Sequence, residues 1–172
     1  MRNIVCYIDE KVKNNNNNHF ITPRVSKTSN SIDNTQCKKI NIANFYNLIE
    51  KDGPIIISPG AAIEFTKDGI SNNTDIKRIT SSTFNLTLVG IYEISFQITT
   101  NSIGQLVVVL NETEIPYAVF GNNIGGQIIG SCIITTTSPN SIISINNIAH
   151  NSSDITIMPT LANLIIKSYI FM

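Results

Sequence analysis

Between Phe84 and Ile98 the chain alternates apolar and polar residues almost without interruption. The polar positions carry Asn, Thr, Glu, Ser and Gln, and Gly90 separates the alternation into two runs. The apolar positions are Phe84, Leu86, Leu88, Tyr92, Ile94, Phe96 and Ile98. A period of two is typical of a β-strand with one buried face and one wetter face. The pattern therefore predicts two strands, each with one face in a core.

The chain from Pro54 onward repeats short apolar segments bounded by turn signals such as Ser58-Pro59-Gly60 and Ser138-Pro139-Asn140. We predict strands over residues 55–57, 61–65, 79–88, 91–99, 106–110, 115–120, 128–136, 142–148, 155–158 and 164–171. Short strands at this spacing, without helical segments between them, favour an antiparallel sandwich or barrel. The length of the region suits a jelly roll, in which two sheets bury a shared core. The predicted fold class is all-β: an antiparallel jelly-roll sandwich with an irregular N-terminal arm.

Residues 1–53 differ in composition from the rest, and we predict that they form an arm or connector beside a jelly-roll domain at residues 54–172. The alternation in residues 1–12 fits one short strand. Residues 13–36 are polar and rich in Asn, as expected for a linker. Helical spacing of four apolar residues ahead of Gly53 predicts one or two helical turns there: Ile42, Phe45, Tyr46 and Ile49.

The strand predicted at residues 106–110 is apolar on both faces, so both faces must be covered. In a sandwich of two layers, we expect the second cover to come from a neighbouring subunit. The charges of residues 92–172 favour the same interpretation, because they are few and the buried centre of an interface is depleted of charge: Glu93, Glu112, Glu114, Asp154 and Lys167. A neutral surface of Asn, Thr and Ser is the alternative. The residues expected at the subunit interface are Tyr92, Phe96, Leu106, Val108, Leu110, Tyr117, Tyr169 and Phe171.

None of the reactive groups converges on a catalytic or metal site. The Gly-rich segment 121–126 is followed by Gln127, where a phosphate-binding loop needs Lys. Cys132 lies inside a predicted strand, and no acid or amide that could orient a pair with His150 is evident. His19 and His150 stand in unrelated contexts. We therefore predict a protein that is not an enzyme, with no catalytic, cofactor-binding or metal-binding residues and no cofactor.

The three cysteines lack the spacing of a metal site and cannot form a closed set of internal pairs. We expect Cys132 to be a buried thiol within its strand. Cys6 and Cys37 lie in the irregular N-terminal part. Either both are free, or one of them forms an intermolecular disulfide after assembly in an oxidising setting.

Charge and hydropathy exclude two classes of partner. Residues 1–53 carry eight basic and five acidic residues, and residues 54–172 carry four basic and seven acidic residues. These small net charges lack the clustered basic face of a nucleic-acid-binding protein. No apolar run is long enough to cross a bilayer, and no secretory signal opens the chain. We expect a protein made in a cytoplasm without a signal peptide, with neither nucleic acid nor membrane as a partner.

Residues 45–160 resemble a known group of proteins in the order and spacing of short runs. The runs are Phe45-Tyr46-Asn47-Leu48, Pro59-Gly60-Ala61-Ala62-Ile63-Glu64-Phe65, Ile76-Lys77-Arg78-Ile79, Ser82-Thr83-Phe84-Asn85-Leu86, Gly90-Ile91-Tyr92-Glu93-Ile94-Ser95-Phe96-Gln97, Gly104-Gln105-Leu106-Val107-Val108-Val109-Leu110-Asn111, Glu114-Ile115-Pro116-Tyr117, Gln127-Ile128-Ile129-Gly130 and Asn146-Asn147-Ile148-Ala149. This part of the chain resembles the C-terminal domain of Bacillus collagen-like exosporium glycoproteins and their relatives in clostridia and giant viruses.

The resemblance implies a jelly roll of the complement globular-head or tumour-necrosis-factor type that assembles as a tight homotrimer. It also implies a non-enzymatic role at the tips of filaments on spores or virions. The sequence departs from the family at His150, where glycine is common, and in lacking a Gly-Gly pair after Ala162. A collagen-like stalk is also absent, so residues 1–53 must supply any tether. The family has no stereotyped ligand site from which functional residues could be carried over.

We therefore expect a structural, self-assembling protein of a particle or filament surface, assembled on a spore or alternatively on a virion. Its partners would be copies of itself, as a homotrimer or a fibre, and other particle-surface proteins bound through the N-terminal arm. In one version of this hypothesis, residues 1–12 add as a strand to the sheet edge of a neighbour. The alternative is a glycan- or host-surface-binding module at a filament tip, which would use the loops 121–127 and 138–141 at one end of the sandwich.

Overall fold

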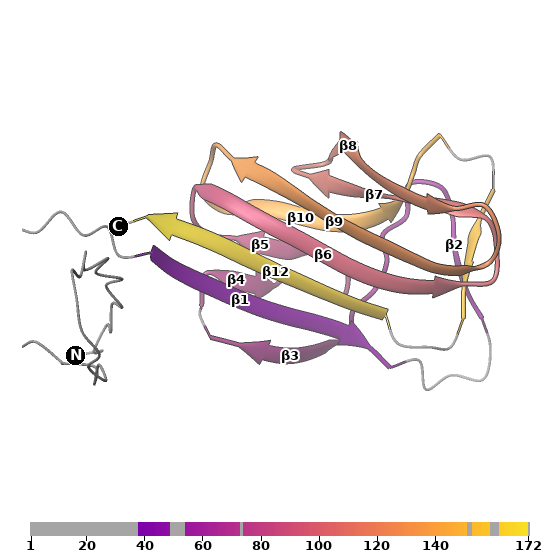
Figure 1. Ribbon diagram of the computed structural model, residues 1–172, viewed down its shortest axis with the longest axis horizontal. Helices are drawn as coiled ribbons and strands as arrows, with labels where there is room; N and C mark the ends of the chain where they lie inside the picture. The colour runs from indigo at the N-terminus through magenta and orange to yellow at the C-terminus, as the bar shows by residue number, and fades with distance from the viewer. Residues whose placement is uncertain (1–37, 49–53, 73, 151–152, 159–161, 172) are drawn as a thin grey trace, which may run out of the picture.

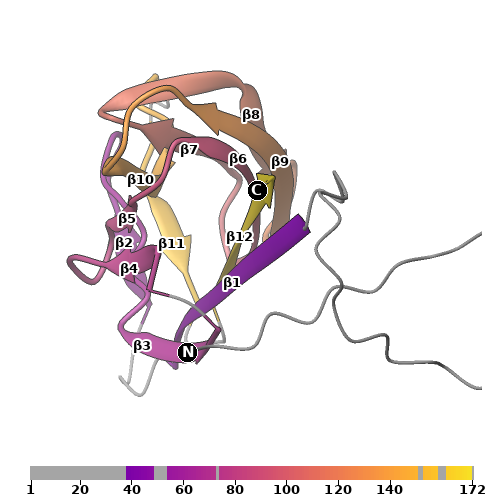
Figure 2. The same ribbon diagram turned by 90° about the vertical axis from the view of Figure 1, so that its left-hand side faces the viewer.

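The computed structural model describes residues 38–48, 54–72, 74–150, 153–158 and 162–171, and every regular element within them is a β-strand. The strands form two antiparallel sheets that lie one behind the other (Figure 1). Seen from one end, the two sheets enclose a shared interior (Figure 2). The prediction of an all-β, antiparallel jelly-roll sandwich is confirmed.

The larger sheet contains seven strands. Their order is β2 (Ile55–Ile57), β11 (Ile155–Ile157), β6 (Gly90–Thr100), β12 (Ala162–Phe171), β1 (Lys38–Asn47) and β3 (Lys67–Ser71), and β9 (Gly126–Thr136) pairs with β6. The β6–β9 ladder is continuous from Gly90 opposite Thr136 to Thr100 opposite Gly126. Long, regular pairing of this kind keeps alternate side chains of β9, β6, β12 and β1 on one outer face.

The smaller sheet contains five strands. Their order is β4 (Ile76–Arg78), β5 (Phe84–Leu86), β10 (Ser141–Asn147), β7 (Gly104–Leu110) and β8 (Thr113–Asn122). β7 and β8 form a hairpin whose two turn residues, Asn111 and Glu112, have φ angles of 48° and 64°. Two consecutive residues with positive φ are typical of a turn that matches the twist of the hairpin. The register of β8 then shifts between the partners of Val107 and Val109.

The core lies between the two inner faces, and the apolar rows predicted from the alternation of β6 and β5 lie inside it. Phe84 packs between Phe45 and Phe65, with ring centroids 4.3 and 6.0 Å away. At the side where β8 and β9 meet, Phe96 and Phe120 pack edge to face at 5.5 Å. These aromatic contacts join the two sheets across the interior.

Residues Lys38–Asn47 form a strand, so the helical turns predicted from Ile42 onward are wrong for this stretch. β1 lies between β12 and β3, and a domain boundary at residue 53 would therefore divide the sheet. On the inner, buried side, Asn41 and Asn47 flank Ala43 and Phe45. Because half of this buried face is polar, the apolar residues alone do not show the period of two. Residues 1–37 lie outside the described residues, and the arm predicted there stays a prediction.

Two further strand predictions need correction. Residues 61–65 are irregular apart from one bridge between Ala62 and Asn146, although Ile63 and Phe65 are buried. The strand predicted at residues 79–88 is limited to β5, and β3 and β4 form in a region where none was predicted. These short edge strands are polar or charged, which hides them from a search for apolar alternation.

The two ends of the sandwich carry different loops. At one end of the sandwich, the first residue of β1, Lys38, lies opposite Phe171 of β12. Gly90 of β6 lies opposite Thr136 of β9 at the same end. The loop after Thr136 is therefore at this end, whereas the loop before Gly126 is at the opposite end. The loops 121–127 and 138–141 do not share one end, so they cannot form the single binding surface proposed for them.

Candidate functional site

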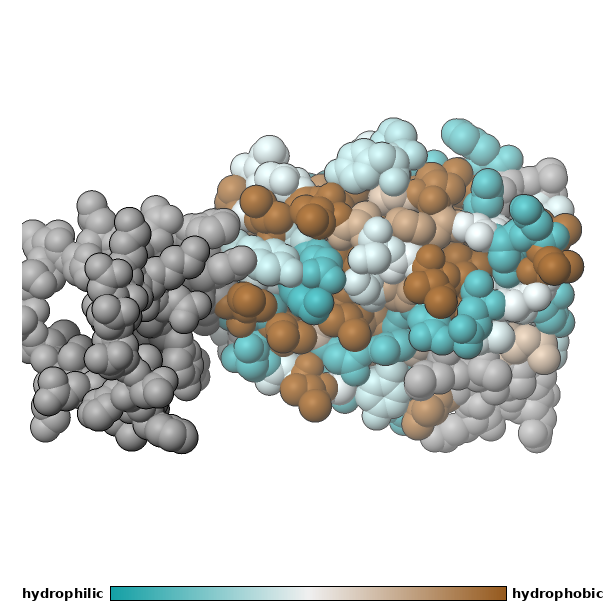
Figure 3. Space-filling model, viewed as in Figure 1, coloured by the Kyte–Doolittle hydropathy of each residue, from teal (hydrophilic) through white to brown (hydrophobic). Residues whose placement is uncertain are grey.

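The outer face of the seven-stranded sheet carries exposed isoleucines among polar residues. On β9, Ile129 and Ile133 are 65% and 62% exposed, and on β6 Ile91 is 40% exposed. Figure 3 shows this face, where hydrophobic patches lie between neutral and hydrophilic ones over β9, β6, β12 and β1. Exposed apolar residues that gather on one face of a protein are typical of an interaction surface.

Strand register joins these residues across the sheet. Ile91 lies opposite Tyr169 of β12, and Tyr169 lies opposite Ile40 of β1. At the border of the sheet where β9 meets β8, the Tyr117 hydroxyl of β8 donates to the carbonyl oxygen of Ile133 at 3.4 Å. The Tyr117 side chain is nevertheless 69% exposed. We refer to the following residues as the association surface: Ile40, Ile91, Tyr117, Ile129, Ile133, Ile165 and Tyr169.

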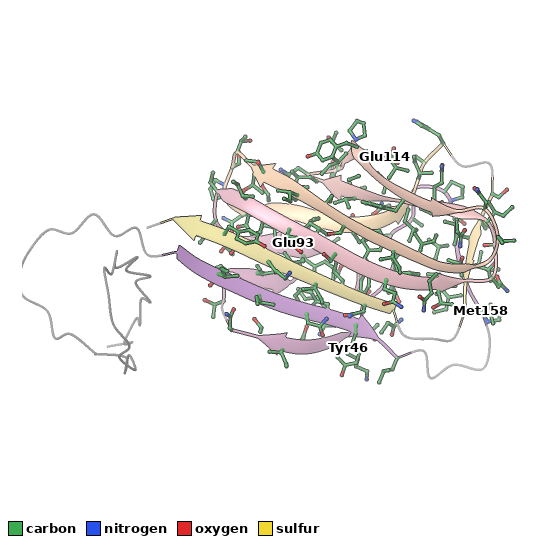
Figure 4. All side chains as sticks on the ribbon, viewed as in Figure 1. Tyr46, Glu93, Glu114 and Met158 are labelled. Carbon is green, nitrogen blue, oxygen red and sulfur yellow. The ribbon has the colours of Figure 1, made fainter. Side chains whose placement is uncertain are left out.

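One polar cluster lies within this surface, between β6 and β12. The Glu93 carboxylate accepts hydrogen bonds from the Tyr169 hydroxyl at 2.5 Å and from the Lys167 ammonium at 3.0 Å. Glu93 lies on the outer face between these two strands (Figure 4). The hydrogen bond from Tyr169, followed by that from Lys167, lowers the pKa of Glu93, and the same contacts raise the pKa values of Tyr169 and Lys167.

The cluster is neutral as a unit, because one carboxylate is paired with one ammonium and the tyrosine stays protonated. A paired and hydrogen-bonded charge can be buried at lower cost than an isolated one. Glu93 and Lys167 are the two charged residues among the outward positions of β9, β6 and β12 that the structure describes. The face is therefore suited to contact with another apolar, uncharged protein surface.

Most of the residues predicted at the interface lie elsewhere. Tyr92, Phe96, Leu106 and Val108 are in the core between the sheets and are at most 3% exposed. A single chain already excludes solvent from them, so association has no exposed surface of theirs to cover. Tyr117 and Tyr169 do lie on the association surface, and Leu110 packs partly buried against the core. The side chain of Phe171 lies outside the described residues, as do Cys6 and Cys37.

Sequence reasoning missed Ile91, Ile129 and Ile133. The signal that identifies them is an apolar residue in the polar row of a strand, because Ile129 and Ile133 alternate with Gln127, Ser131 and Thr135. The prediction used the larger residues of the apolar row instead. In a strand with a buried face, that row is already occupied by the core of its own subunit.

The second face of β7 is covered by the chain itself, which corrects the expectation that a neighbouring subunit must cover it. Val107 and Val109 point to the outer side and are 0% and 8% exposed. The segment after β10 lies over this side, where the Ala149 amide donates to the Glu114 carboxylate of β8 at 2.8 Å. A strand that is apolar on both faces therefore does not by itself indicate association.

The described residues bring no catalytic group together. Cys132 packs against the core between the sheets, and burial raises the pKa of its thiol to about 11. His150 is exposed on the outer side of the five-stranded sheet, so the two do not form a pair. In the described ranges no three His, Cys, Asp or Glu side chains could hold a metal ion together. The same part of the chain contains no helix long and apolar enough to span a membrane.

Comparison with known proteins identifies the fold. No protein-family model matches the chain, and no curated protein matches it. Among solved structures, the chain is similar to the globular domain of zebrafish complement 1qA protein, with a TM-score of 0.53 and 12% identity over 74% of this chain and 94% of that one. It is also similar to murine APRIL, with a TM-score of 0.52 and 10% identity over 76% of this chain and 99% of that one. The protein therefore has a jelly roll of the complement 1q and tumour-necrosis-factor type.

Proposed function

We propose that the protein is a non-enzymatic structural subunit that self-assembles as a homotrimer through the association surface. The observation that carries this proposal is the exposed row of isoleucines on β9 and β6 around one neutral polar cluster. Covering apolar surface gains about 25 cal/mol per Å², before the costs of association are subtracted. The resemblance to exosporium glycoproteins supports the trimer.

The arrangement of the surface favours a ring over a two-fold dimer. Tyr117, Ile129 and Ile133 lie at the border formed by β8 and β9, whereas Ile165 and Tyr169 lie on β12 in the middle of the sheet. Contact between the border of one copy and the middle of the next is heterologous. A heterologous contact must close into a ring or continue as a filament. Three copies are the closed form that we propose.

Replacing Ile133 with Glu tests the surface. In the trimer this carboxylate would be buried without a partner, at a cost of roughly 3 kcal/mol per contact, or about a hundredfold in the association constant. Analytical ultracentrifugation should therefore show a folded monomer for Ile133→Glu. Ile79→Glu is the matched control, because Ile79 is 56% exposed and lies outside the association surface. Trimers that persist in Ile133→Glu, or that are lost equally in the control, would contradict the proposed surface.

We place the trimer at the surface of a spore or, alternatively, of a virion, with the N-terminal residues as the connector. The resemblance to exosporium glycoproteins supports this location. Electron microscopy of the purified full chain should show particles or filaments, and deletion of residues 1–20 should leave folded trimers that no longer polymerise. Filaments that form equally well after the deletion would show that the N-terminal residues are not the connector.

A further inference from the structure

The outer side of the five-stranded sheet contains a groove of about 990 Å³. Its apolar lining comes from three neighbouring strands and from the segment that follows β10: Val107, Val109, Pro116, Val119, Ile142 and Ile148. The groove lies on the outer side of the five-stranded sheet, and Tyr117 of β8 is the one residue of the association surface that comes from this sheet. A trimer formed through the seven-stranded sheet would therefore leave the groove open to other contacts.

The polar residues of the groove are acidic or neutral. Glu112 and Glu114 of the β7–β8 hairpin line one part of the groove. His150, which belongs to the segment after β10, lines another part. The lining includes neither Lys nor Arg. An apolar groove with two carboxylates and no cation is complementary to an extended segment that carries apolar and basic residues together.

The chain itself contains such a segment. Phe20-Ile21-Thr22-Pro23-Arg24-Val25-Ser26-Lys27 combines three large apolar side chains with two basic ones, and no acidic residue occurs between Glu10 and Asp33. Pro23 fixes its own φ angle and disfavours helical backbone at Thr22, which lowers the entropy lost when the segment docks. The segment precedes Lys38 by eleven or more residues, a tether of roughly 35 Å when extended.

We propose that the segment Phe20–Lys27 of one copy docks in the groove of a second copy. Phe20, Ile21 and Val25 would cover the apolar groove residues that a single chain leaves partly or fully exposed, which are Pro116, Val119, Ile142 and Ile148. Arg24 and Lys27 would approach Glu112 and Glu114. The inference rests on the proposed function in one respect: the association surface is taken as the trimer contact, so the groove remains free to join one trimer to the next. Docking of this kind links copies without using a free strand edge.

Photo-crosslinking from position 20 of the full chain tests the proposal. The chain is made with benzoylphenylalanine in place of Phe20, as an equal mixture of ¹⁴N and ¹⁵N copies, and irradiated at low and at high salt. Mass spectrometry should locate cross-links in peptides that contain residues 107–119 or 142–150. The linked pairs should include pairs of one ¹⁴N and one ¹⁵N peptide, which form only between different copies. The yield should fall several-fold at high salt, because the ion pairs are screened.

Charge reversal at the hairpin sharpens the test. Glu112→Lys should lower the yield several-fold, whereas the control Glu64→Lys, which changes an exposed glutamate outside the groove, should not. Cross-links at other sites, cross-links within single copies alone, or yields that Glu112→Lys leaves unchanged would overturn the proposal. Light scattering of the same samples reports the trimer separately, so the docking and the trimer can fail independently.

Discussion

The outer faces of the two sheets both contain apolar residues, but they differ in what covers them. On the five-stranded sheet, Val107 and Val109 are shielded within one chain, beside the contact of Ala149 with Glu114. On the seven-stranded sheet, Ile129 and Ile133 are more than half exposed. An apolar strand thus indicates a partner only where the rest of the chain leaves it uncovered. For this reason we place the trimer contact on the seven-stranded sheet, whereas the outer side of the five-stranded sheet offers only the groove between partly exposed residues.

The largest expected effect comes from placing a charge on each face in turn. Val107→Asp should lower the free energy of unfolding by roughly 3 kcal/mol or more, because the carboxylate is buried without a partner. Ile129→Asp should change it by less than about 0.5 kcal/mol, since the side chain is exposed in a single subunit. Urea unfolding should compare both in an Ile133→Glu background, so that assembly does not contribute to stability. Equal effects at the two sites would remove the distinction between the faces.

The next effect concerns the strand that presents the exposed isoleucines. A Cβ atom at Gly130 of β9 would lie 2.4 Å from Phe96 and 2.8 Å from Phe120, the aromatic pair that joins the two sheets. Gly130→Ala should therefore destabilise the fold by about 1–3 kcal/mol through overpacking. Gly90→Ala is the matched control, because a Cβ atom there meets nothing within 4 Å. If Gly130→Ala leaves the free energy of unfolding unchanged, β9 is free to shift away from the core.

The fold was largely predictable, because β5 and β6 bury one face each and their sequences alternate accordingly. β1 was not, since Asn41 and Asn47 occupy buried positions where hydrogen bonds to Asp75 and from Thr66 replace apolar packing. Such partners come from residues distant in sequence, so the local pattern cannot reveal them. The association surface was missed for a different reason. Alternation divides each strand into an inward row and an outward row of side chains, and the interface was predicted from the inward row, which fills the core.

A smaller effect concerns the cover of β7. Glu114→Ala should remove the acceptor for the Ala149 amide and weaken this contact by about 1 kcal/mol. Hydrogen exchange of the Ala149 amide should then become roughly fivefold faster. Glu114→Gln is the control, because its amide oxygen can still accept this hydrogen bond. An exchange rate that stays the same in Glu114→Ala would show that the segment is held over Val107 by packing alone.

The smallest effect is the titration of the polar cluster on the association surface. Hydrogen bonds from Tyr169 and Lys167 lower the pKa of Glu93, so its stabilising contribution is present above the pKa of an unfolded chain and is lost as the pH falls through the lowered value. Tyr169→Phe should raise the pKa of Glu93 toward its ordinary range, measured by carboxyl carbon NMR. Gln127→Ala is the control, because Gln127 is exposed on the same face and lies opposite Thr99, six positions along β6 from Glu93. If the pKa of Glu93 is unchanged in Tyr169→Phe, the hydrogen bond from Tyr169 to Glu93 does not form.

The molar mass of the full chain in solution decides whether three copies associate. Light scattering coupled to size exclusion, at several loading concentrations, measures that mass without reference to shape. We expect a discrete species of three chains, each of 18.9 kDa, that persists on dilution to micromolar concentration. A stable species of one chain, with Ile91, Ile129 and Ile133 left in solvent, would contradict it.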